Sequence, residues 1–187
     1  MSDLRALLFD LDGTLVDTVG ATSTAYSRAL RDFGVAAQPD ECAAIAAGRQ
    51  WRDFLPELLA RAGSSADPAA IARRKREIYP ELLSDVRVNA PLVALAKSAR
   101  SILLLGLVTT SSAEGVEAVL RQFALQELFH VVVTGDDVAH HKPAPDAYLD
   151  AMARLGVSPT ECIAFEDSES GIASAAAAGI PVVKVAI

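Results

Sequence analysis

The chain has 187 residues, of which 51% are hydrophobic and 22% are charged, and its formal net charge at pH 7 is −7. This composition is typical of a globular protein with a sizeable core, built as one domain or as one domain with a modest insertion. The acidic balance argues against nucleic acid and anionic membranes as general partners.

The first predicted strand is the apolar run Leu7–Phe9, and two aspartates follow it closely, Asp10 and Asp12. Residues two apart on an extended segment point the same way, so both carboxylates are expected at the C-terminal end of a parallel strand. In open α/β sheets this is the end that binds ligands. Like charges held so close need a cation or a shared proton. An acidic turn without a chemical role is the alternative explanation of this stretch taken alone.

Between about 16 and 87 the sequence predicts helices and no strand. Apolar residues recur at helical spacing, Gly34 ends the first helix, and Asp67-Pro68 is a typical helix start. The four predicted helices follow residue 17, cover 39–47, include 51–59, and run from 68 to about 82. We interpret 16–88 as an α-helical domain inserted directly behind the first strand.

From residue 89 onward, predicted helices and strands alternate. The expected strands are 102–108, 131–133, 162–165 and 181–185. The expected helices are 91–99, one that includes 116–123, one that ends near 155, and one that ends near 178. Such alternation predicts a Rossmann-like, doubly wound parallel sheet with right-handed crossovers. Residues 1–15 and 89–187 would form this α/β core.

Four of the predicted strands are followed by polar residues that suit phosphoryl transfer. In chain order these residues are Asp10, Asp12, Thr109 or Thr110, Lys142, Glu166 and Asp167. The C-terminal ends of parallel strands share one edge of the sheet, so these side chains are expected to converge there. Carboxylates are ligands that Mg²⁺ prefers, and a lysine offers a point charge to a phosphate. Both cations would lower the repulsion between an anionic nucleophile and an anionic substrate.

These segments resemble the motifs of the haloacid dehalogenase-like (HAD) superfamily. The motifs are Asp10-Leu-Asp12-Gly13-Thr14, Thr109 after a hydrophobic strand, Lys142-Pro143, and Glu166-Asp167-Ser168 with Gly171, in the family's order. The helical insertion resembles the cap domain of the phosphoglycolate phosphatase and β-phosphoglucomutase branch. The resemblance implies a HAD-like hydrolase with an α-helical cap.

The resemblance also implies a role for each matching residue. Asp10 would be the nucleophile that forms an aspartyl-phosphate, and Asp12 the general acid and then the general base. Thr109 and Lys142 would hold the transferring phosphoryl group. In many members an asparagine stands where this chain has Thr110, so Thr110 is a candidate for substrate binding and for the second motif.

A Mg²⁺ ion is the cofactor that the resemblance implies. Its ligands would be the carboxylates of Asp10 and Asp167, the backbone carbonyl of Asp12, and Glu166 directly or through water. For Ser111 and Ser112, which follow the second motif, helix N-capping is the preferred interpretation.

In the predicted cap, Arg49 lies where members of this branch contact substrate, and it is a candidate for binding an anionic group. Mutases of the branch have a cap histidine shortly after the first motif, and this chain has none there. We therefore predict a Mg²⁺-dependent phosphatase that hydrolyses a small phosphate monoester, such as a sugar phosphate or a phosphoglycolate-like acid. The alternatives are a phosphomutase of the β-phosphoglucomutase type and a non-catalytic phosphate-binding protein on the same fold.

The expected cellular location and partners follow from sequence features such as apolar runs, the N-terminal segment and the cysteines. Its longest apolar run, near 102–108, is too short to span a bilayer. No basic segment with a long apolar core begins the chain, so no signal peptide is expected. Cys42 and Cys162 fit no metal-binding or redox pattern and are expected to be free thiols. We expect a cytoplasmic monomer or homodimer whose partner is a small phosphorylated metabolite, without nucleic acid or membrane.

Overall fold

The computed structural model describes residues 3–46 and 49–187. The chain folds into two compact units, one formed by Met1–Asp17 with Arg87–Ile187 and the other by Thr18–Val86. Throughout the two described stretches, no helix has both the length and the apolar character needed to cross a membrane. The predicted end of the second helix, Ala47, lies outside the described residues.

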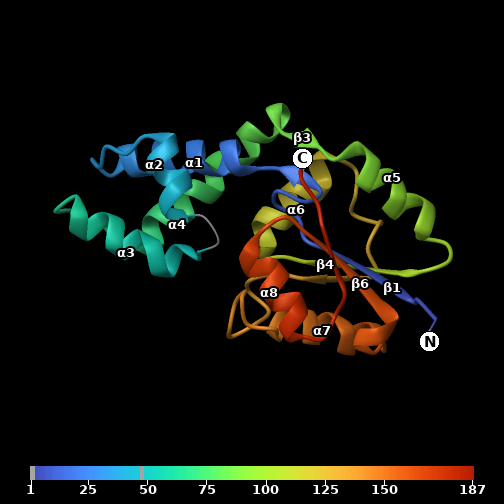
Figure 1. The fold of residues 1–187 in the computed structure, drawn as a ribbon. Coiled ribbons are helices and arrows are strands. Elements are labelled where there is room, and N and C mark those ends of the chain that lie inside the picture. Colours follow the sequence, from blue (N-terminus) through green and yellow to red (C-terminus); the bar gives the residue numbers. More distant parts are fainter. Residues whose placement is uncertain (1–2, 47–48) are drawn as a thin grey trace. The chain divides into compact units, whose positions relative to one another are not determined.

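The first unit is built on a parallel sheet of five strands in the order β5-β4-β1-β6-β7. The strands are β1 (Ala6–Phe9), β4 (Leu104–Val108), β5 (Val131–Val133), β6 (Cys162–Glu166) and β7 (Val182–Lys184). The helices of this unit are α5 (Ala90–Ala99), α6 (Ala113–Gln122), α7 (Asp146–Leu155), the 3-10 helix η2 (Pro159–Glu161) and α8 (Glu169–Ala177). Figure 1 shows α5 and α6 on one face of the sheet and α7 and α8 on the other. The predicted Rossmann-like α/β architecture is confirmed.

Strand β1 lies in the middle of this sheet and is buried on both faces. It pairs in parallel with β4 on one side and with β6 on the other. Leu8 packs into the core on the α7 side, whereas Phe9 stacks on Phe165, with ring centroids 4.9 Å apart. An apolar run without alternation is what a strand covered on both faces requires. This rigid central strand carries Asp10 at its C-terminal end.

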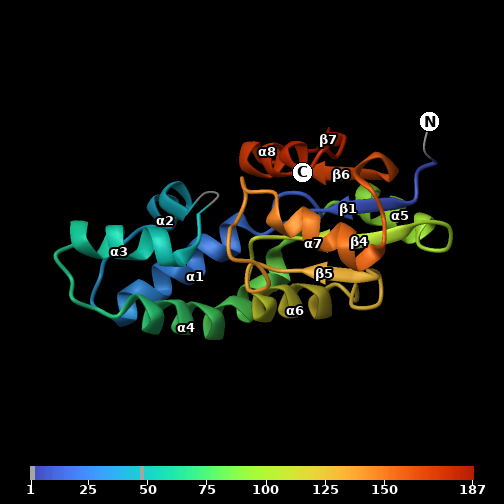
Figure 2. The ribbon, with the colours of Figure 1, turned by 90° about the horizontal axis from the view of Figure 1, so that it is seen from below.

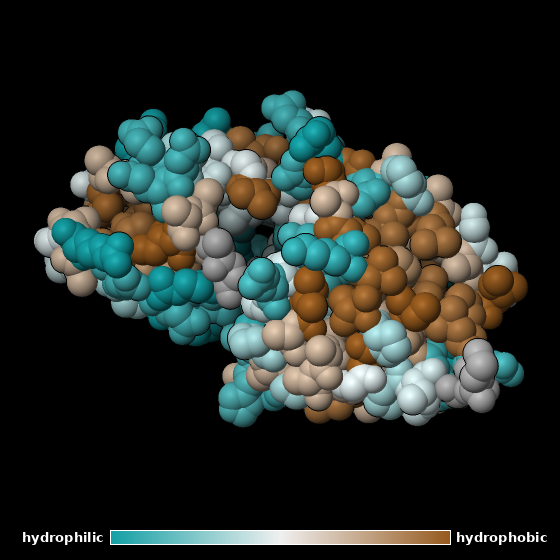
Figure 3. Space-filling view, viewed as in Figure 1, coloured by the Kyte–Doolittle hydropathy of each residue, from teal (hydrophilic) through white to brown (hydrophobic). Residues whose placement is uncertain are grey.

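The sheet face that bears Phe165 is less well covered toward β7. Val183 pairs with Phe165 across the two strands and is 44% exposed. Leu95 on α5 and Ile187 are also exposed. Figure 3 shows hydrophobic surface, drawn in brown, gathered where β7 and α5 lie. This face of β7 is therefore an apolar surface of the α/β unit.

Two local predictions about this unit were wrong. Residues 16–17 form β2 (Val16–Asp17), which pairs antiparallel with β3 (Arg87–Val88), where only helix or coil was expected. Strands of two residues are too short to show an alternating pattern. The strand predicted at 102–108 begins at Leu104, because Ile102 belongs to a turn and is 79% exposed.

The second unit is helical, as predicted for the insertion. Its elements are α1 (Val19–Asp32), α2 (Pro39–Ala46), α3 (Trp51–Arg61), α4 (Pro68–Ile78) and the 3-10 helix η1 (Tyr79–Asp85). The Asp67 side chain caps α4 by accepting a hydrogen bond from the backbone N–H of Ala69 at 2.9 Å. Tyr26 meets Phe54 edge to face in the core of the unit, with centroids 5.0 Å apart. Figure 2 shows α1 to α4 from a second direction.

Candidate active site

The sheet edge formed by the C-terminal ends of β1, β4 and β6 collects the predicted site residues of the α/β unit. Asp10 directly follows β1, and its backbone N–H donates a hydrogen bond to the carbonyl of Phe165 at 3.0 Å. Glu166 is the last residue of β6, and Thr109 directly follows β4. The parallel register of the three strands therefore brings residues from distant parts of the sequence to one place.

Lys142 is held at this edge by three acceptors. Its Nζ donates to Asp10 Oδ1 at 2.8 Å, to Glu166 Oε1 at 2.6 Å and to the backbone carbonyl of Val108 at 2.8 Å. An ammonium group has three protons, so its donor capacity is fully used. Lys142 is only 6% exposed and Glu166 is fully buried. The lysine is thus fixed in position rather than free to sample rotamers.

The charges of this cluster do not balance. Asp10, Glu166 and Asp167 contribute three carboxyl groups around the single ammonium of Lys142. Burial raises the pKa of Asp10 to about 7, and the neighbouring Glu166 and Asp12 act in the same direction against the charge of Lys142. Burial and Glu166 also raise the pKa of Asp167. Surplus negative charge in a buried place is stabilised by a bound cation or by a proton.

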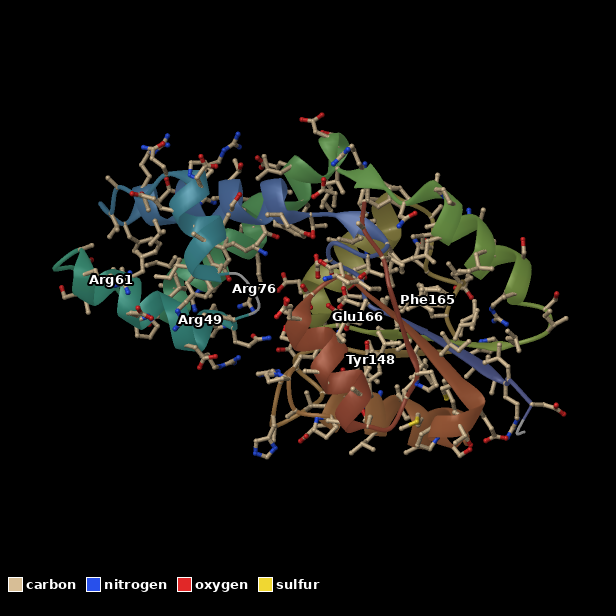
Figure 4. All side chains as sticks on the ribbon, in the orientation of Figure 1. Arg49, Arg61, Arg76, Tyr148, Phe165 and Glu166 are labelled. Atoms are coloured by element: carbon tan, nitrogen blue, oxygen red, sulfur yellow. The ribbon has the colours of Figure 1, made fainter. Side chains whose placement is uncertain are left out.

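Tyr148 on α7 belongs to this cluster and was not predicted from the sequence. Its hydroxyl donates to Glu166 Oε1 at 2.7 Å, the same oxygen that accepts from Lys142. Its ring centroid lies 5.2 Å from Lys142 Nζ, within the range of a cation–π contact. Figure 4 shows the labelled side chains of Tyr148 and Glu166 next to each other. Tyr148 therefore orients the carboxylate that in turn holds the lysine.

Two glycines leave room for the carboxylates of the last motif. Gly13 has φ +87°, and a Cβ atom there would lie 2.2 Å from Asp167 Oδ2. A Cβ atom at Gly171 would lie 2.0 Å from Glu166 Oε2. Thr14 adds a hydrogen bond from its hydroxyl to Asp167 Oδ1 at 3.2 Å. Glycine is therefore required in the first and last motifs because any larger residue would overlap these carboxylates.

Asp12 has different neighbours from Asp10. Its Oδ2 accepts hydrogen bonds from the hydroxyls of Thr109, at 3.3 Å, and Ser111, at 2.7 Å. The N-capping prediction holds for Ser112, whose hydroxyl accepts from the backbone N–H of Gly115. It was wrong for Ser111, because the chain turns after β4 and directs this hydroxyl to Asp12. No sequence pattern distinguishes the two adjacent serines.

Thr110, the alternative second-motif residue, lies half-buried after the same strand. The hydrogen bond between Thr109 and Asp12 connects the second motif with the first. The backbone N–H of Ser111 also donates to the Thr109 hydroxyl at 3.1 Å. These contacts favour Thr109 as the second-motif residue, and the role of Thr110 stays a prediction.

A metal ion can be accommodated by part of the predicted ligand set. Asp10, Glu166 and Asp167 each offer one carboxylate oxygen, and the three oxygens lie within 4.8 Å of one another. Hard divalent cations such as Mg²⁺ prefer oxygen ligands of this kind. The Asp12 side chain instead binds Thr109 and Ser111, which agrees with a ligand role for its backbone carbonyl alone. The donor chemistry of the cluster fits the implied metal.

Arg49, the predicted substrate contact of the helical unit, is exposed at the start of α3. Its Nη2 binds Glu57 Oε2 at 2.9 Å, and Arg61 binds the other oxygen of the same carboxylate. The three side chains border a hollow of about 630 Å³ between α2 and α3. Figure 4 labels Arg49 and Arg61 in this unit. A role of Arg49 in substrate binding stays a prediction.

Comparison with known proteins relates this geometry to a family. Residues 7–185 match the family described as haloacid dehalogenase-like hydrolase. The chain is 35% identical to the fructose-1-phosphate phosphatase YqaB of Escherichia coli (strain K12) over 179 residues, which is 96% of this chain and 95% of that protein.

Solved structures agree with the sequence match. The chain superimposes on CbbY from Rhodobacter sphaeroides in complex with phosphate with a TM-score of 0.90 and 28% identity, covering 98% of this chain and 87% of that one. A mutant of the same protein in complex with xylulose-(1,5)bisphosphate gives a TM-score of 0.89 at the same identity and coverage. The chain therefore belongs to the haloacid dehalogenase-like hydrolase family.

Proposed function

We propose that the protein is a Mg²⁺-dependent phosphatase that hydrolyses a small sugar phosphate. The observation that carries the proposal is the hydrogen bond from Lys142 Nζ to Asp10 Oδ1, at 2.8 Å. Beside it lies a second aspartate, Asp12, whose carboxylate accepts from two hydroxyls. One aspartate is thus paired with a cation that can attract a phosphate, and the carboxylate of the other is positioned by two hydrogen bonds. The names of YqaB, a fructose-1-phosphate phosphatase, and of the CbbY complexes support a phosphorylated sugar as substrate.

The proposed reaction has two steps. In the first, a carboxylate oxygen of Asp10 forms a bond to phosphorus while the ester P–O bond breaks, and Asp12 gives its proton to the departing alkoxide oxygen. In the second, a water molecule attacks the phosphorus of the aspartyl-phosphate, and Asp12 takes the proton of that water. The bond between phosphorus and Asp10 breaks and inorganic phosphate leaves. Thr109 donates to an oxygen of the phosphoryl group in both steps, and Lys142 attracts these oxygens through its positive charge.

The proposed metal site consists of Asp10, Asp167, the backbone carbonyl of Asp12, and Glu166 directly or through water. The Oε1 atom of Glu166 already accepts from Lys142 and Tyr148, so Oε2 is the oxygen left for the metal or for a water molecule bound to it. Mg²⁺ bound there would reduce the repulsion between the anionic nucleophile and the anionic substrate.

The proposal is tested by measuring phosphate release from a panel of sugar phosphates with Mg²⁺ and with EDTA. Asp10→Asn is the test variant, and Asp3→Asn, at an exposed position outside the sheet, is the matched control. We expect turnover that EDTA and Asp10→Asn abolish and that Asp3→Asn leaves intact. Turnover that survives both treatments would overturn the mechanism. A phosphorylated isomer without free phosphate would identify a mutase, and the absence of turnover would favour a non-catalytic phosphate-binding protein.

We further propose that residues 16–88 act as a cap domain for the core formed by 1–15 and 89–187, and that Arg49 binds an anionic group of the substrate. Arg49 and Arg61 share the partner Glu57, so each is a control for the other. Loss of a substrate contact at Arg49→Gln is expected to raise KM about tenfold, the equivalent of about 1.4 kcal/mol. Arg61→Gln is expected to leave KM unchanged. Equal KM values for the two variants would exclude this role of Arg49.

A further inference from the structure

A second polar pocket lies in the α/β unit, at the opposite end of the sheet from Asp10. It has a volume of about 380 Å³, and its lining includes Leu4, Arg5, Arg100, Ile102 and His130. Strand β1 begins at Ala6 and β4 at Leu104, so the pocket adjoins the N-terminal ends of both strands. Figures 1 and 2 show these ends beside the turn that precedes β4. The four residues of β1 separate the two sites by about 13 Å of strand.

The hydrogen bonds of His130 in this pocket indicate which of its ring nitrogens carries the proton. The backbone N–H of Leu105 donates to His130 Nδ1 at 2.9 Å, and the backbone N–H of His130 donates to the Leu105 carbonyl at 2.8 Å. A ring nitrogen that accepts a hydrogen bond carries no proton, so the proton of the neutral imidazole is on Nε2. Burial and the charge of Arg100 lower the pKa of His130, in agreement with a neutral ring. Nε2 is therefore a hydrogen-bond donor.

This donor faces another donor. Arg100 Nη1 lies 2.5 Å from His130 Nε2, and a guanidinium group has no acceptor and keeps its protons. The Nε atom of Arg100 is buried and also has no hydrogen-bond partner. Two N–H groups thus approach each other without the acceptor that such an arrangement requires. The two nitrogens are too close for an atom between them, but the pocket beside them is open, and an oxyanion bound there would accept from both side chains.

The surroundings of this pair fit a small anion. Arg5 adds a second guanidinium, whose side chain is half exposed and forms an ion pair with Glu161 at 3.2 Å. Two arginines in one pocket stand out in a chain with a net charge of −7. The rim is apolar, because Ile102 is 79% and Leu4 is 41% exposed. Arginine and histidine N–H groups bind oxyanions through charge-assisted hydrogen bonds.

We propose that this pocket is an oxyanion site that binds a phosphate group against the side chains of Arg100 and His130. The phosphate is either inorganic phosphate or the end of a phosphate ester, whose carbon atoms would contact Leu4 and Ile102. In this site Arg100 donates from its guanidinium and His130 from Nε2, while Arg5 supplies further positive charge. The site is separate from the proposed active site and uses none of its residues.

The test is a titration followed by ¹H–¹⁵N NMR, because backbone amide shifts report where the ligand binds. Inorganic phosphate is added with EDTA present, up to about ten times a Kd on the order of 1 mM. The amides of Leu105 and His130 report the new pocket, whereas those of Gly13 and Ser111 report the active site. We expect saturable shifts at Leu105 and His130 with a binding curve of their own. A second titration with glycerol 2-phosphate distinguishes the two sources, since tighter binding of the ester means that the apolar rim contributes.

Three variants make the assignment specific. Arg100→Gln is expected to weaken binding at least tenfold at the Leu105 and His130 amides and to leave the shifts of Gly13 unchanged. Arg100→Lys keeps the charge but loses the planar donors, and an intermediate affinity is expected. Arg121→Gln, an exposed arginine of α6, removes the same charge elsewhere and serves as the control. Amides of Leu105 and His130 that stay unmoved in the wild type, or that still shift in a folded Arg100→Gln variant, would overturn the proposal.

Discussion

Replacement of Gly171 by alanine is expected to disrupt the buried cluster around Lys142. Gly171 lies in the first turn of α8, and a Cβ atom there would lie 2.0 Å from Glu166 Oε2 and 2.1 Å from its Cδ. Ordinary contacts of a Cβ atom begin at 3.4 Å, so the carboxylate must move by at least about 1.4 Å. The backbone of Glu166 is held in β6, so the side chain has to take up the displacement. Glu166 Oε1 then leaves Lys142 and Tyr148.

The size of the effect follows from two opposing contributions. Breaking a buried ion pair costs about 3–5 kcal/mol, because an uncompensated charge remains buried. Alanine in place of glycine in a helix contributes up to about 1 kcal/mol in the other direction. We therefore expect Gly171→Ala to lower the free energy of unfolding by about 2–4 kcal/mol. Because Lys142 loses one of its three acceptors, the proposed hydrolysis should also slow by about 100-fold, as expected for a misplacement of about 1 Å.

Gly115 provides a matched control in the same unit. It is the third residue of α6 after the cap Ser112, just as Gly171 is the third residue of α8 after the cap Ser168. The serine hydroxyl accepts from the glycine N–H in both helices. A Cβ atom at Gly115 would meet only the Ser112 hydroxyl, at 3.4 Å. Gly115→Ala is thus expected to be neutral or to stabilise by up to about 1 kcal/mol.

Urea denaturation monitored by circular dichroism measures both variants. The expected difference in the free energy of unfolding between Gly115→Ala and Gly171→Ala is about 3–5 kcal/mol. Equal stabilities would refute the steric argument, because they would mean that the Glu166 carboxylate moves aside without losing its partners. A stable Gly171→Ala enzyme with full activity would also show that the position of Glu166 is unimportant for Lys142.

Two further predictions concern the same site, and a third concerns the start of α5. Tyr148→Phe removes one donor to the Glu166 carboxylate, and urea denaturation should show a loss of about 1.5–3 kcal/mol. Gly13→Ala combines a strained φ of +87° with a clash against Asp167, and phosphate release should fall by more than about 100-fold, whereas unchanged turnover would contradict a fixed position of that carboxylate. Asn89→Ala removes the N-cap of α5 and the hydrogen bond from Asn89 Nδ2 to the Thr14 carbonyl, so urea denaturation should show a loss of about 1–2 kcal/mol in the free energy of unfolding.

The sheet and its order of elements could be predicted because their causes are local in the sequence. Leu7–Phe9 is apolar without alternation, which already indicates a strand buried on both faces. Asp67-Pro68 and Ser112 act through hydrogen bonds to neighbours in the chain, so both caps are visible as short patterns. The residues at the strand ends were expected to converge because all parallel strands share a direction.

The contacts within the site could not be predicted, because they depend on side chains that the fold brings together from far apart. Tyr148 lies on the buried face of α7, where an aromatic residue is ordinarily a packing residue, and only the path of α7 brings its hydroxyl to Glu166. Ser111 and Ser112 have the same side chain, and the turn after β4 decides which one caps α6 and which one binds Asp12. Composition and periodicity contain no information about such orientations.

Both proposed sites were identified by the same criterion, which is that groups within the protein lack a partner of opposite charge or a hydrogen-bond acceptor. The two sites therefore test this criterion independently. At the C-terminal edge of the sheet, three carboxyl groups surround one ammonium, so the edge lacks a cation. At the N-terminal edge, Arg100 and His130 direct donors toward each other, so the edge lacks an acceptor. A buried group without its partner costs free energy, and at the N-terminal edge this applies to the Arg100 Nε atom, whereas His130 is exposed. The first edge agrees with a known family, whereas the second rests on the criterion alone, so phosphate binding at Arg100 would show that unmatched groups by themselves locate a site.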